Sequence, residues 1–242
     1  ILPMLPARVP SARKSKRSEL EFLEFALQDE IDRRDQKNLT RRVGRAGFEE
    51  EQTLEGFDWN APITFDRDRV RDLFSLGFVE RQEDVVLLGP VGVGKTFLAC
   101  ALGHAACRAG YDVLFLRADR PFQLLLQSRA DHSTEKVLRR LLAPDVLVID
   151  DFGLRRLDAR QSSDVSEVVL ERHRRASTIV TSNRAIDAWV PLVDDPILVQ
   201  SAIDRLAHNA YQVVIDGESY RKRQTPGERP GECPDVPRPR SP

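Results

Sequence analysis

From residue 66 onward, short runs of apolar residues alternate with longer stretches of helical periodicity. Five runs have the length and composition of buried strands, at residues 85–88, 113–116, 146–149, 178–181 and 212–215. Helical spacing is found before and between them, at 68–76, 96–109, 121–129, 134–142, 159–175 and 197–207. Continuous apolar strands separated by helices are typical of a parallel sheet covered on both faces. The pattern predicts an α/β domain over residues 66–221.

The pattern before this domain is different. Leu20, Leu23, Leu27 and Ile31 recur at helical spacing and predict a helix from residue 19 to about residue 34. We expect a second, basic helix at 36–45. The two helices would form a small helical domain, and the expected divisions are 1–17 (a basic, flexible terminus), 18–47 (the helical domain), 48–65 (a linker), 66–221 (the α/β domain) and 222–242 (a disordered, proline-rich tail). This division leaves no room for a helical lid after the last strand.

The first predicted strand is followed by Gly89-Pro-Val-Gly-Val-Gly-Lys-Thr96. The pattern G-x-x-x-x-G-K-T between a strand and a helix is typical of a loop that binds nucleotide phosphates. Its glycines allow backbone N–H groups to converge, and the helix N-terminus adds its dipole. We expect Lys95 to reach the β- and γ-phosphates of ATP and Thr96 to hold Mg²⁺. The expected nucleotide contacts are Gly89, Pro90, Val91, Gly92, Val93, Gly94, Lys95, Thr96 and Phe97.

Two acids end the third apolar strand. Asp150, at the carboxyl end of a parallel strand, would face the phosphates and hold Mg²⁺ together with Thr96. Asp151 would orient or deprotonate the attacking water. Acids at strand ends are also common turn residues, but the phosphate loop upstream favours the functional interpretation. Asp151-Phe-Gly also matches a kinase metal motif, which we reject because the chain has no His-Arg-Asp catalytic loop.

Three further residues are candidates for the same site. Asn183 closes the fourth strand, where its amide could hydrogen-bond the γ-phosphate or the water, although Asn also favours turns. Arg205 and Arg221 could each stabilise transition-state charge at a neighbouring subunit's nucleotide. The alternative for both arginines is a solvated surface charge.

Composition and charge limit the kinds of partner that the chain can be expected to bind. The chain has 242 residues, 41% of them apolar and 31% charged, with a net charge of −1, so its overall charge predicts no nucleic-acid binding. The basic residues nevertheless cluster at 1–18 and 33–45, where they could meet phosphate backbones or form a solvated face. The sequence contains no run of about 20 apolar residues, so we expect no membrane span.

The cysteines indicate a reducing, cytoplasmic setting. Cys100 and Cys107 are seven residues apart on one predicted helix, about 10 Å along its axis, which is too far for a disulfide. Cys100, His104 and Cys107 share a helical face and resemble three metal ligands. Helix packing beside the sheet explains such a trio more simply.

Five segments occur in an order that resembles a known family: 89–96, Leu-Val-Ile-Asp-Asp-Phe-Gly at 147–153, Thr-Ile-Val-Thr-Ser-Asn-Arg at 178–184, Ile-Asp-Arg-Leu at 203–206 and Gly-Glu-Ser-Tyr-Arg at 217–221. The sequence looks like the IstB/DnaC branch of AAA+ ATPases, and most like IstB, the helper of an insertion-sequence transposase. The resemblance covers roughly residues 18–223. It implies a P-loop AAA+ three-layer fold with a five-stranded parallel sheet in the order 5-1-4-3-2.

The resemblance also implies roles. Lys95 and Thr96 would belong to Walker A, Asp150 and Asp151 would end Walker B, Asn183 would be sensor 1 and Arg205 the arginine finger. Family members self-assemble on duplex DNA and engage a transposase, so DNA, a transposase and further copies of the chain are the expected partners. Many AAA+ enzymes have Glu at the position of Asp151, so hydrolysis would be slow unless a shifted backbone compensates.

The sequence is also compatible with two other functions. A replicative helicase loader of the DnaC type would use its N-terminal helices to hold a helicase. An ATP-switched DNA scaffold would bind nucleotide with negligible turnover because the Asp151 side chain is short.

Overall fold

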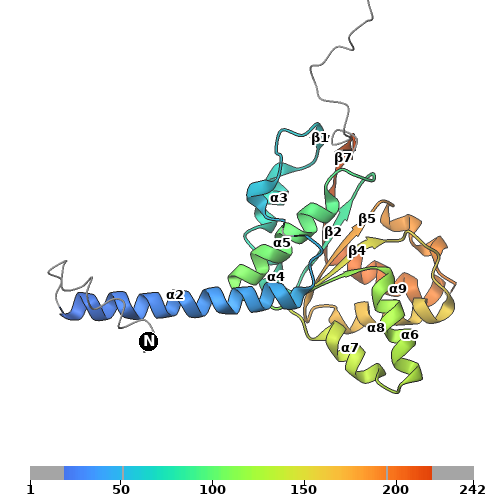
Figure 1. The fold of residues 1–242 in the computed structure, drawn as a ribbon. Helices are drawn as coiled ribbons and strands as arrows, with labels where there is room; N and C mark the ends of the chain where they lie inside the picture. Colours follow the sequence, from blue (N-terminus) through green and yellow to red (C-terminus); the bar gives the residue numbers. More distant parts are fainter. Residues whose placement is uncertain (1–18, 51, 195, 220–242) are drawn as a thin grey trace, which may run out of the picture.

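The computed structural model describes residues 19–50, 52–194 and 196–219. The expected basic terminus at 1–17 and the proline-rich tail at 222–242 lie outside these residues. Within the part described, the core of the fold is a five-stranded sheet with helices on both faces (Figure 1). A long helix, α2 (Glu19–Ala46), extends away from this core.

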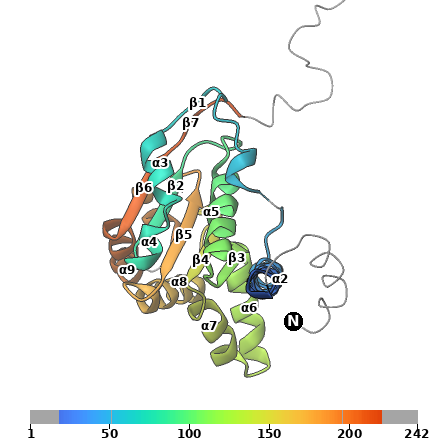
Figure 2. The same cartoon turned by 90° about the vertical axis from the view of Figure 1, so that its left-hand side faces the viewer.

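All neighbouring pairs in the main sheet are parallel, in the order β3-β4-β5-β2-β6. The strands are β2 (Asp84–Leu88), β3 (Val113–Arg117), β4 (Val146–Phe152), β5 (Ser177–Ser182) and β6 (Ala210–Val214). Numbered along the chain within this sheet and read from β6, the order is 5-1-4-3-2, which confirms the prediction. β3 and β6 are therefore the edge strands of this sheet, and β5 lies between β4 and β2 (Figure 2).

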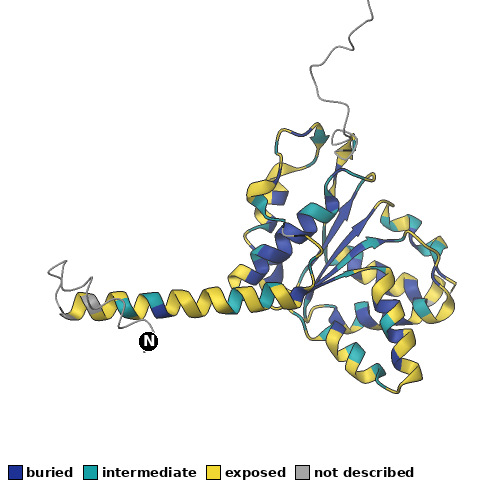
Figure 3. Ribbon diagram, in the orientation of Figure 1, coloured by how far each residue is buried: buried dark blue, intermediate teal, exposed yellow. Residues whose placement is uncertain are grey.

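Two apolar layers flank the sheet. On one face, α5 (Lys95–Ala109), α3 (Arg67–Leu73) and α4 (Gly77–Glu80) pack against inward side chains such as Val85, Leu87 and Val148. The opposite face carries α6 (Asp119–Ala130), α7 (Thr134–Leu142), α8 (Ala159–Arg172) and α9 (Pro196–His208). Alternate residues of the strands serve the two layers, as a parallel sheet with two covered faces requires. The strands are buried between these layers (Figure 3).

The N-terminal segment differs from the prediction, because α2 is one continuous helix where we expected two. The expected break near Asp35 does not occur. Glu30 accepts hydrogen bonds from Arg33 and Arg34, and no glycine or proline interrupts the segment before Gly44. The last two turns anchor the helix, since Leu39, Val43 and Ala46 pack into the core beside α5, and the preceding turns are largely exposed (Figure 3).

Aromatic contacts hold the linker against the α/β domain. Phe57 is buried among Trp59, Phe65 and Phe97, with ring centroids 5.0 to 5.8 Å away. A 3-10 turn, η1 (Leu54–Gly56), precedes this cluster. Because Phe97 is in the first turn of α5, the linker is fixed next to the loop that precedes that helix.

A second, two-stranded sheet was not predicted. β1 (Ile63–Thr64) pairs antiparallel with β7 (Asp216–Gly217), and each strand is too short to show an apolar period. Two further 3-10 turns, η2 (Ile186–Ala188) and η3 (Val190–Leu192), follow β5. Among the residues described, no helix has the length and apolar character needed to cross a bilayer.

Candidate nucleotide site

The loop between β2 and α5 has the backbone that a phosphate cradle needs. Gly89 and Gly92 have φ angles of 151° and 86°, and a Cβ at either position would lie 2.0 Å from another atom. Gly94 precedes Lys95, the first residue of α5, and has no side chain to cap the helix. The amide groups of the first turn are therefore directed toward the loop, where an anionic phosphate can bind.

Lys95 lies under this loop rather than out in solvent. Its side chain is 6% exposed, and Nζ donates a hydrogen bond of 2.7 Å to the carbonyl of Pro90. Val91, at the tip of the loop, is exposed. The ammonium group is thus already inside the curve of the loop, at the position from which it can reach a phosphate.

Thr96 and Asp150 come together from the two expected motifs. The Thr96 hydroxyl donates to both carboxylate oxygens of Asp150, at 3.0 and 3.2 Å. Asp150 is 4% exposed, and burial raises the pKa of its carboxyl group, whereas hydrogen bonds from Thr181 and Thr96 lower it. A hydroxyl and a carboxylate that converge in this way form an all-oxygen donor pair, which suits Mg²⁺.

Sequence reasoning missed Thr181, which is buried in β5 between the two motif strands. Its hydroxyl donates to Asp150 Oδ1 at 2.6 Å and accepts a hydrogen bond of 2.9 Å from the backbone N–H of Asp151. A threonine in an apolar strand resembles an ordinary β-forming residue, so its type carries no signal of a polar role. Its position, two residues before Asn183, was the available clue.

The strand that carries the two acids contains a β-bulge. Ile149 pairs with Val180 and Phe152 pairs with Ser182, so two residues, Asp150 and Asp151, stand opposite Thr181 alone. Asp151 has a φ of 59°, in the left-handed region that Asp tolerates better than most residues. The alternation of the strand is shifted by this bulge, since Val148 faces the α5 layer and Phe152 faces the α8 and α9 layer.

The bulge brings the second carboxylate to the same side as the first. Arg117, at the end of β3, is level with Asp150 in the sheet register, and its guanidinium lies 3.7 Å from Asp151 Oδ2. Regular alternation would have directed Asp151 to the opposite face from Asp150. The site therefore combines one buried carboxylate with one that is half-exposed and paired with a cation.

Asn183 and Arg205 are placed very differently. Asn183 follows Ser182, whose carbonyl accepts a hydrogen bond of 3.2 Å from the N–H of Gly89, so its backbone lies at the start of the phosphate loop. Arg205 is exposed on α9, in a pocket of about 270 Å³ that His173 and Asn209 also line. The carbonyl of Asn209 bonds Asp84 N–H at the amino end of β2, so Arg205 is at the opposite end of the sheet from the loop. Arg221 lies outside the described residues.

The segment after β6 closes one side of the loop. The carbonyl of Ile215 is the atom that a Cβ on Gly89 would meet, and Ser219 Oγ is the atom that a Cβ on Gly92 would meet. Gly217 belongs to β7, which pairs with β1. The first and last strands described therefore lie together beside the phosphate loop (Figure 1).

The cysteine and histidine residues of α5 pack inside the protein. Cys100, His104 and Cys107 are buried, and the Phe48 ring stacks on His104 at 4.2 Å. Burial raises the pKa of Cys100 to about 12 and that of Cys107 to about 11, so both thiols stay protonated at neutral pH. Among the residues described, no three side chains of the metal-binding types are grouped around a possible ion.

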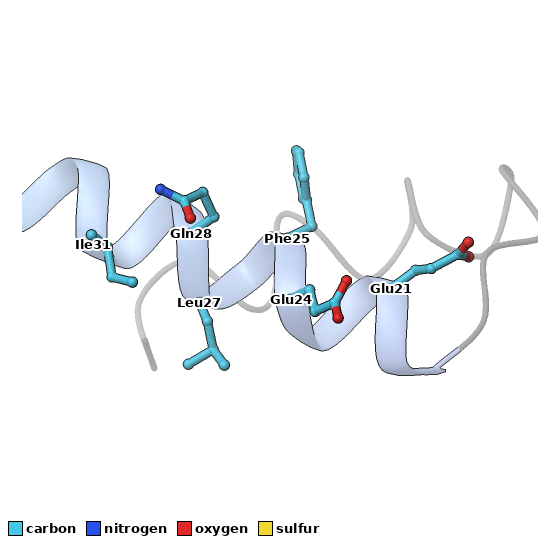
Figure 4. Close-up of a pocket in the computed structure, with 6 residues that line it drawn as sticks. All are labelled: Glu21, Glu24, Phe25, Leu27, Gln28 and Ile31. Atoms are coloured by element: carbon cyan, nitrogen blue, oxygen red, sulfur yellow. The ribbon is translucent and has the colours of Figure 1, made fainter.

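A separate groove of about 680 Å³ lies on the outer half of α2. Figure 4 shows its lining residues, which are Glu21, Glu24, Phe25, Leu27, Gln28 and Ile31. The lining residues among those described all belong to α2 and are mostly acidic or apolar, so they lack the positive charge that suits a nucleotide. We assign the nucleotide site to the phosphate loop.

Comparison with known proteins agrees with this geometry. The profile of the family described as IstB-like ATP binding protein matches residues 3–227. The chain belongs to this family. A relative from Mycobacterium tuberculosis, named as an ATP-binding protein in an insertion sequence, is 40% identical over 94% of this chain and 91% of its own length. A second, from the insertion sequence IS21 of Pseudomonas aeruginosa and also named for ATP binding, is 38% identical over 88% and 80%.

Solved structures support the IstB/DnaC assignment of the fold. The DnaC helicase loader is 25% identical with a TM-score of 0.53, over 60% of this chain and 85% of DnaC. DnaI gives a TM-score of 0.58 at 20% identity, over 68% and 90%, and DnaA bound to AMPPCP and single-stranded DNA gives 0.56 at 21%, over 71% and 52%. The IstB-like chain therefore has a P-loop AAA+ fold and an ATP-binding architecture.

Proposed function

We propose that this IstB-like protein is an ATPase that assembles on duplex DNA and assists a transposase in insertion-sequence transposition. The observation that carries the proposal is the contact of Thr96 with Asp150, 3.0 Å apart, at the mouth of the phosphate loop. The names of the relatives, which refer to ATP binding in insertion sequences, support the biological setting.

The site residues would divide the work of hydrolysis. ATP would bind with its phosphates on the N-terminus of α5, and Lys95 would leave Pro90 to contact the β- and γ-phosphates. Thr96 and Asp150 would hold Mg²⁺, which, when bound, offsets the phosphate charge. Asp151 would orient the water or accept its proton, with Asn183 beside it. Water adds to the γ-phosphorus, the bond to the ADP oxygen breaks, and ADP and phosphate leave.

The basic part of α2 is the surface that we propose for DNA. Exposed cations on this segment include Arg33, Arg34, Lys37, Arg41 and Arg45, and the helix projects from the body (Figure 1). A row of cations on a projecting helix can contact phosphate backbones without reading sequence.

Self-association is proposed from the position of Arg205. The arginine is at the far end of the sheet from the loop of its own chain. An arginine finger at this position would have to act on the nucleotide of a neighbouring copy. The proposed ATPase is therefore an oligomer in which each site is completed by the next subunit.

A helicase loader is the second candidate, and the match to DnaC favours it. The transposition helper is preferred because the insertion-sequence relatives are more similar and cover more of the chain. A scaffold with negligible turnover is a third possibility if Asp151 fails to reach the water.

One experiment tests the ATPase, its DNA partner and its assembly together. ATP hydrolysis is measured with and without duplex DNA, and the DNA-bound particles are then imaged. We expect DNA-dependent hydrolysis and regular oligomers on DNA. Equal rates of hydrolysis with and without DNA, together with monomeric particles, would refute the assembly on DNA. The same assay is repeated with a replicative helicase or the transposase added. Stimulation by the helicase and none by the transposase would establish the loader.

A further inference from the structure

We infer that Thr181 is a positioning residue for hydrolysis, which holds the β-bulge that sets both acids on the nucleotide side of the sheet. This inference rests on the proposed ATPase function. Thr181 acts through Asp150 and Asp151, both of which its hydroxyl contacts.

A regular β4 could present only one of the two carboxylates to the loop. Successive side chains of a strand point to opposite faces, and Val148 and Asp150 both point toward α5. Asp151 would then point toward the α8 layer, which is apolar near Phe152. The extra residue in β4 removes this problem, because in a bulge two successive residues stand opposite one partner.

Thr181 is that partner, and its hydroxyl contacts both residues of the bulge. Oγ1 donates to the Asp150 carboxylate at 2.6 Å and accepts from the Asp151 N–H at 2.9 Å. The N–H group of a bulged residue has lost its regular partner in the ladder, and burial without a replacement would be costly. The side chain of Thr181, which is fully buried, supplies the replacement and fixes the carboxylate with the same atom.

The choice of Asp at position 151 follows from the same geometry. The residue has a φ of 59°, which Asp and Asn adopt more readily than Glu. A carboxylate can reach the water either from a longer acid on a regular strand or from a shorter acid on a bulged backbone. This chain uses the second arrangement, in which Thr181 holds the bulge and Asp151 supplies the carboxylate.

The test compares Thr181→Val, which keeps the shape and removes the hydroxyl, with Thr181→Ser, which keeps the hydroxyl. We expect kcat of the Val variant to fall about 10- to 100-fold, as is typical when a partner of a metal ligand is lost. We expect KM for ATP to change less than about threefold, and the Mg²⁺ concentration for half-maximal ATP binding to rise. The Ser variant is expected to stay within about threefold of the unmodified protein in kcat.

Three further measurements separate positioning by Thr181 from a general loss of stability. Thr178→Val removes another buried hydroxyl of β5, one that contacts Arg172 and not the acids, and is expected to lower thermal stability without changing kcat. Amide hydrogen exchange at Asp151 is expected to become faster in Thr181→Val and to stay unchanged in Thr178→Val. Asp151→Glu is expected to lower kcat, because the longer side chain disfavours the left-handed backbone.

The outcomes are distinct from those of the proposed function. Each of three results would overturn the inference. They are a kcat of Thr181→Val equal to that of the unmodified protein, equal losses of kcat in the Ser and Val variants, and amide exchange at Asp151 that is no faster in Thr181→Val than in the unmodified protein. Absence of hydrolysis in the unmodified protein would refute the ATPase instead. The Mg²⁺ titration and the exchange at Asp151 would then still decide whether Thr181 holds the bulge.

Discussion

Arg117 and Asp151 face each other across neighbouring strands, with Nη2 of the arginine 3.7 Å from Oδ2 of the acid. This ion pair holds the Asp151 carboxylate at the end of β3, and removal of the cation would free the carboxylate to turn toward the attacking water. Arg117→Gln is therefore expected to raise hydrolysis in the absence of DNA about two- to fivefold, with thermal stability nearly unchanged because both groups are partly exposed. Steady-state kinetics of the DNA-free protein measures the effect, and a lower rate would show that Arg117 assists the reaction.

Lys95→Ala is expected to abolish nucleotide binding and ATP-dependent assembly on DNA. The buried ammonium group has no equivalent in alanine, and we expect a loss of at least about a hundredfold in ATP affinity. Equilibrium binding of a fluorescent ATP analogue measures it. Lys136→Ala, on the exposed surface of α7, is the matched control and should bind normally. An unchanged affinity in Lys95→Ala would remove the basis of the site assignment.

Arg205→Ala is expected to bind ATP normally and to hydrolyse it about a thousandfold more slowly. If the arginine acts on a neighbouring copy, mixing this variant with Lys95→Ala should restore part of the activity, since each supplies what the other lacks. Arg139→Ala, an exposed arginine of α7 paired with Glu135, serves as the control. No recovery at any mixing ratio would count against the shared site.

Charge on α2 is expected to control DNA affinity and its dependence on salt. The combined variant Lys37→Gln, Arg41→Gln and Arg45→Gln removes three exposed cations and leaves the core contacts of Leu39 and Val43 in place. The slope of log K against log salt should fall by about 2.7 for three lost phosphate contacts. Binding of a fluorescent duplex at several salt concentrations provides the slope. An unaltered slope would move the DNA surface to the ATPase body.

Asp84 gives a pH dependence of stability that is independent of the nucleotide site. Burial raises the pKa of its carboxyl group to about 6, against hydrogen bonds from Thr178 and Asn209 that lower it. Because the folded pKa is raised above 3.8, this contribution to stability is fully present below pH 3.8 and is lost as the pH rises to about 6. Relative to Asp84→Asn, the unmodified protein should lose about 2 kcal/mol between pH 4 and pH 7.

Denaturant unfolding of both proteins at several pH values measures this difference. Asp84 is at the amino end of β2, away from the phosphate loop, so ATP affinity should be unaffected by the substitution. A difference that stays constant with pH would show that the Asp84 carboxyl group titrates normally in the folded protein.

The sequence predicted the sheet and the phosphate loop well because both depend on strong local patterns. Apolar runs marked all five strands of the main sheet, and glycines followed by Lys95 and Thr96 marked the loop. Strand order came from the resemblance to a family, since parallel pairing of distant segments leaves no local signal. Asp158 and Gln161 form a capping box at the start of α8, which is a local pattern of the same kind.

The parts that the sequence did not predict depend on tertiary contacts. The break expected in α2 rested on a change of charge, but Arg33 and Arg34 pair with Glu30 and the helix continues. The bulge at Asp151 and the hydroxyl of Thr181 depend on how β4 meets β5, which no periodicity reveals. Arg117 was missed for the same reason, because its partner is on another strand.

The contact of Ile215 and Ser219 with Gly89 and Gly92 has a practical consequence. A reporter group at Glu218 would lie close in space to the phosphate loop, because the neighbouring residue Ser219 contacts Gly92. Its signal should therefore change when a nucleotide binds to the loop. A reporter on the outer turns of α2 would be far from the loop and would sense docking of a partner. Two labels on one chain could therefore time nucleotide capture against complex formation in a single kinetic trace.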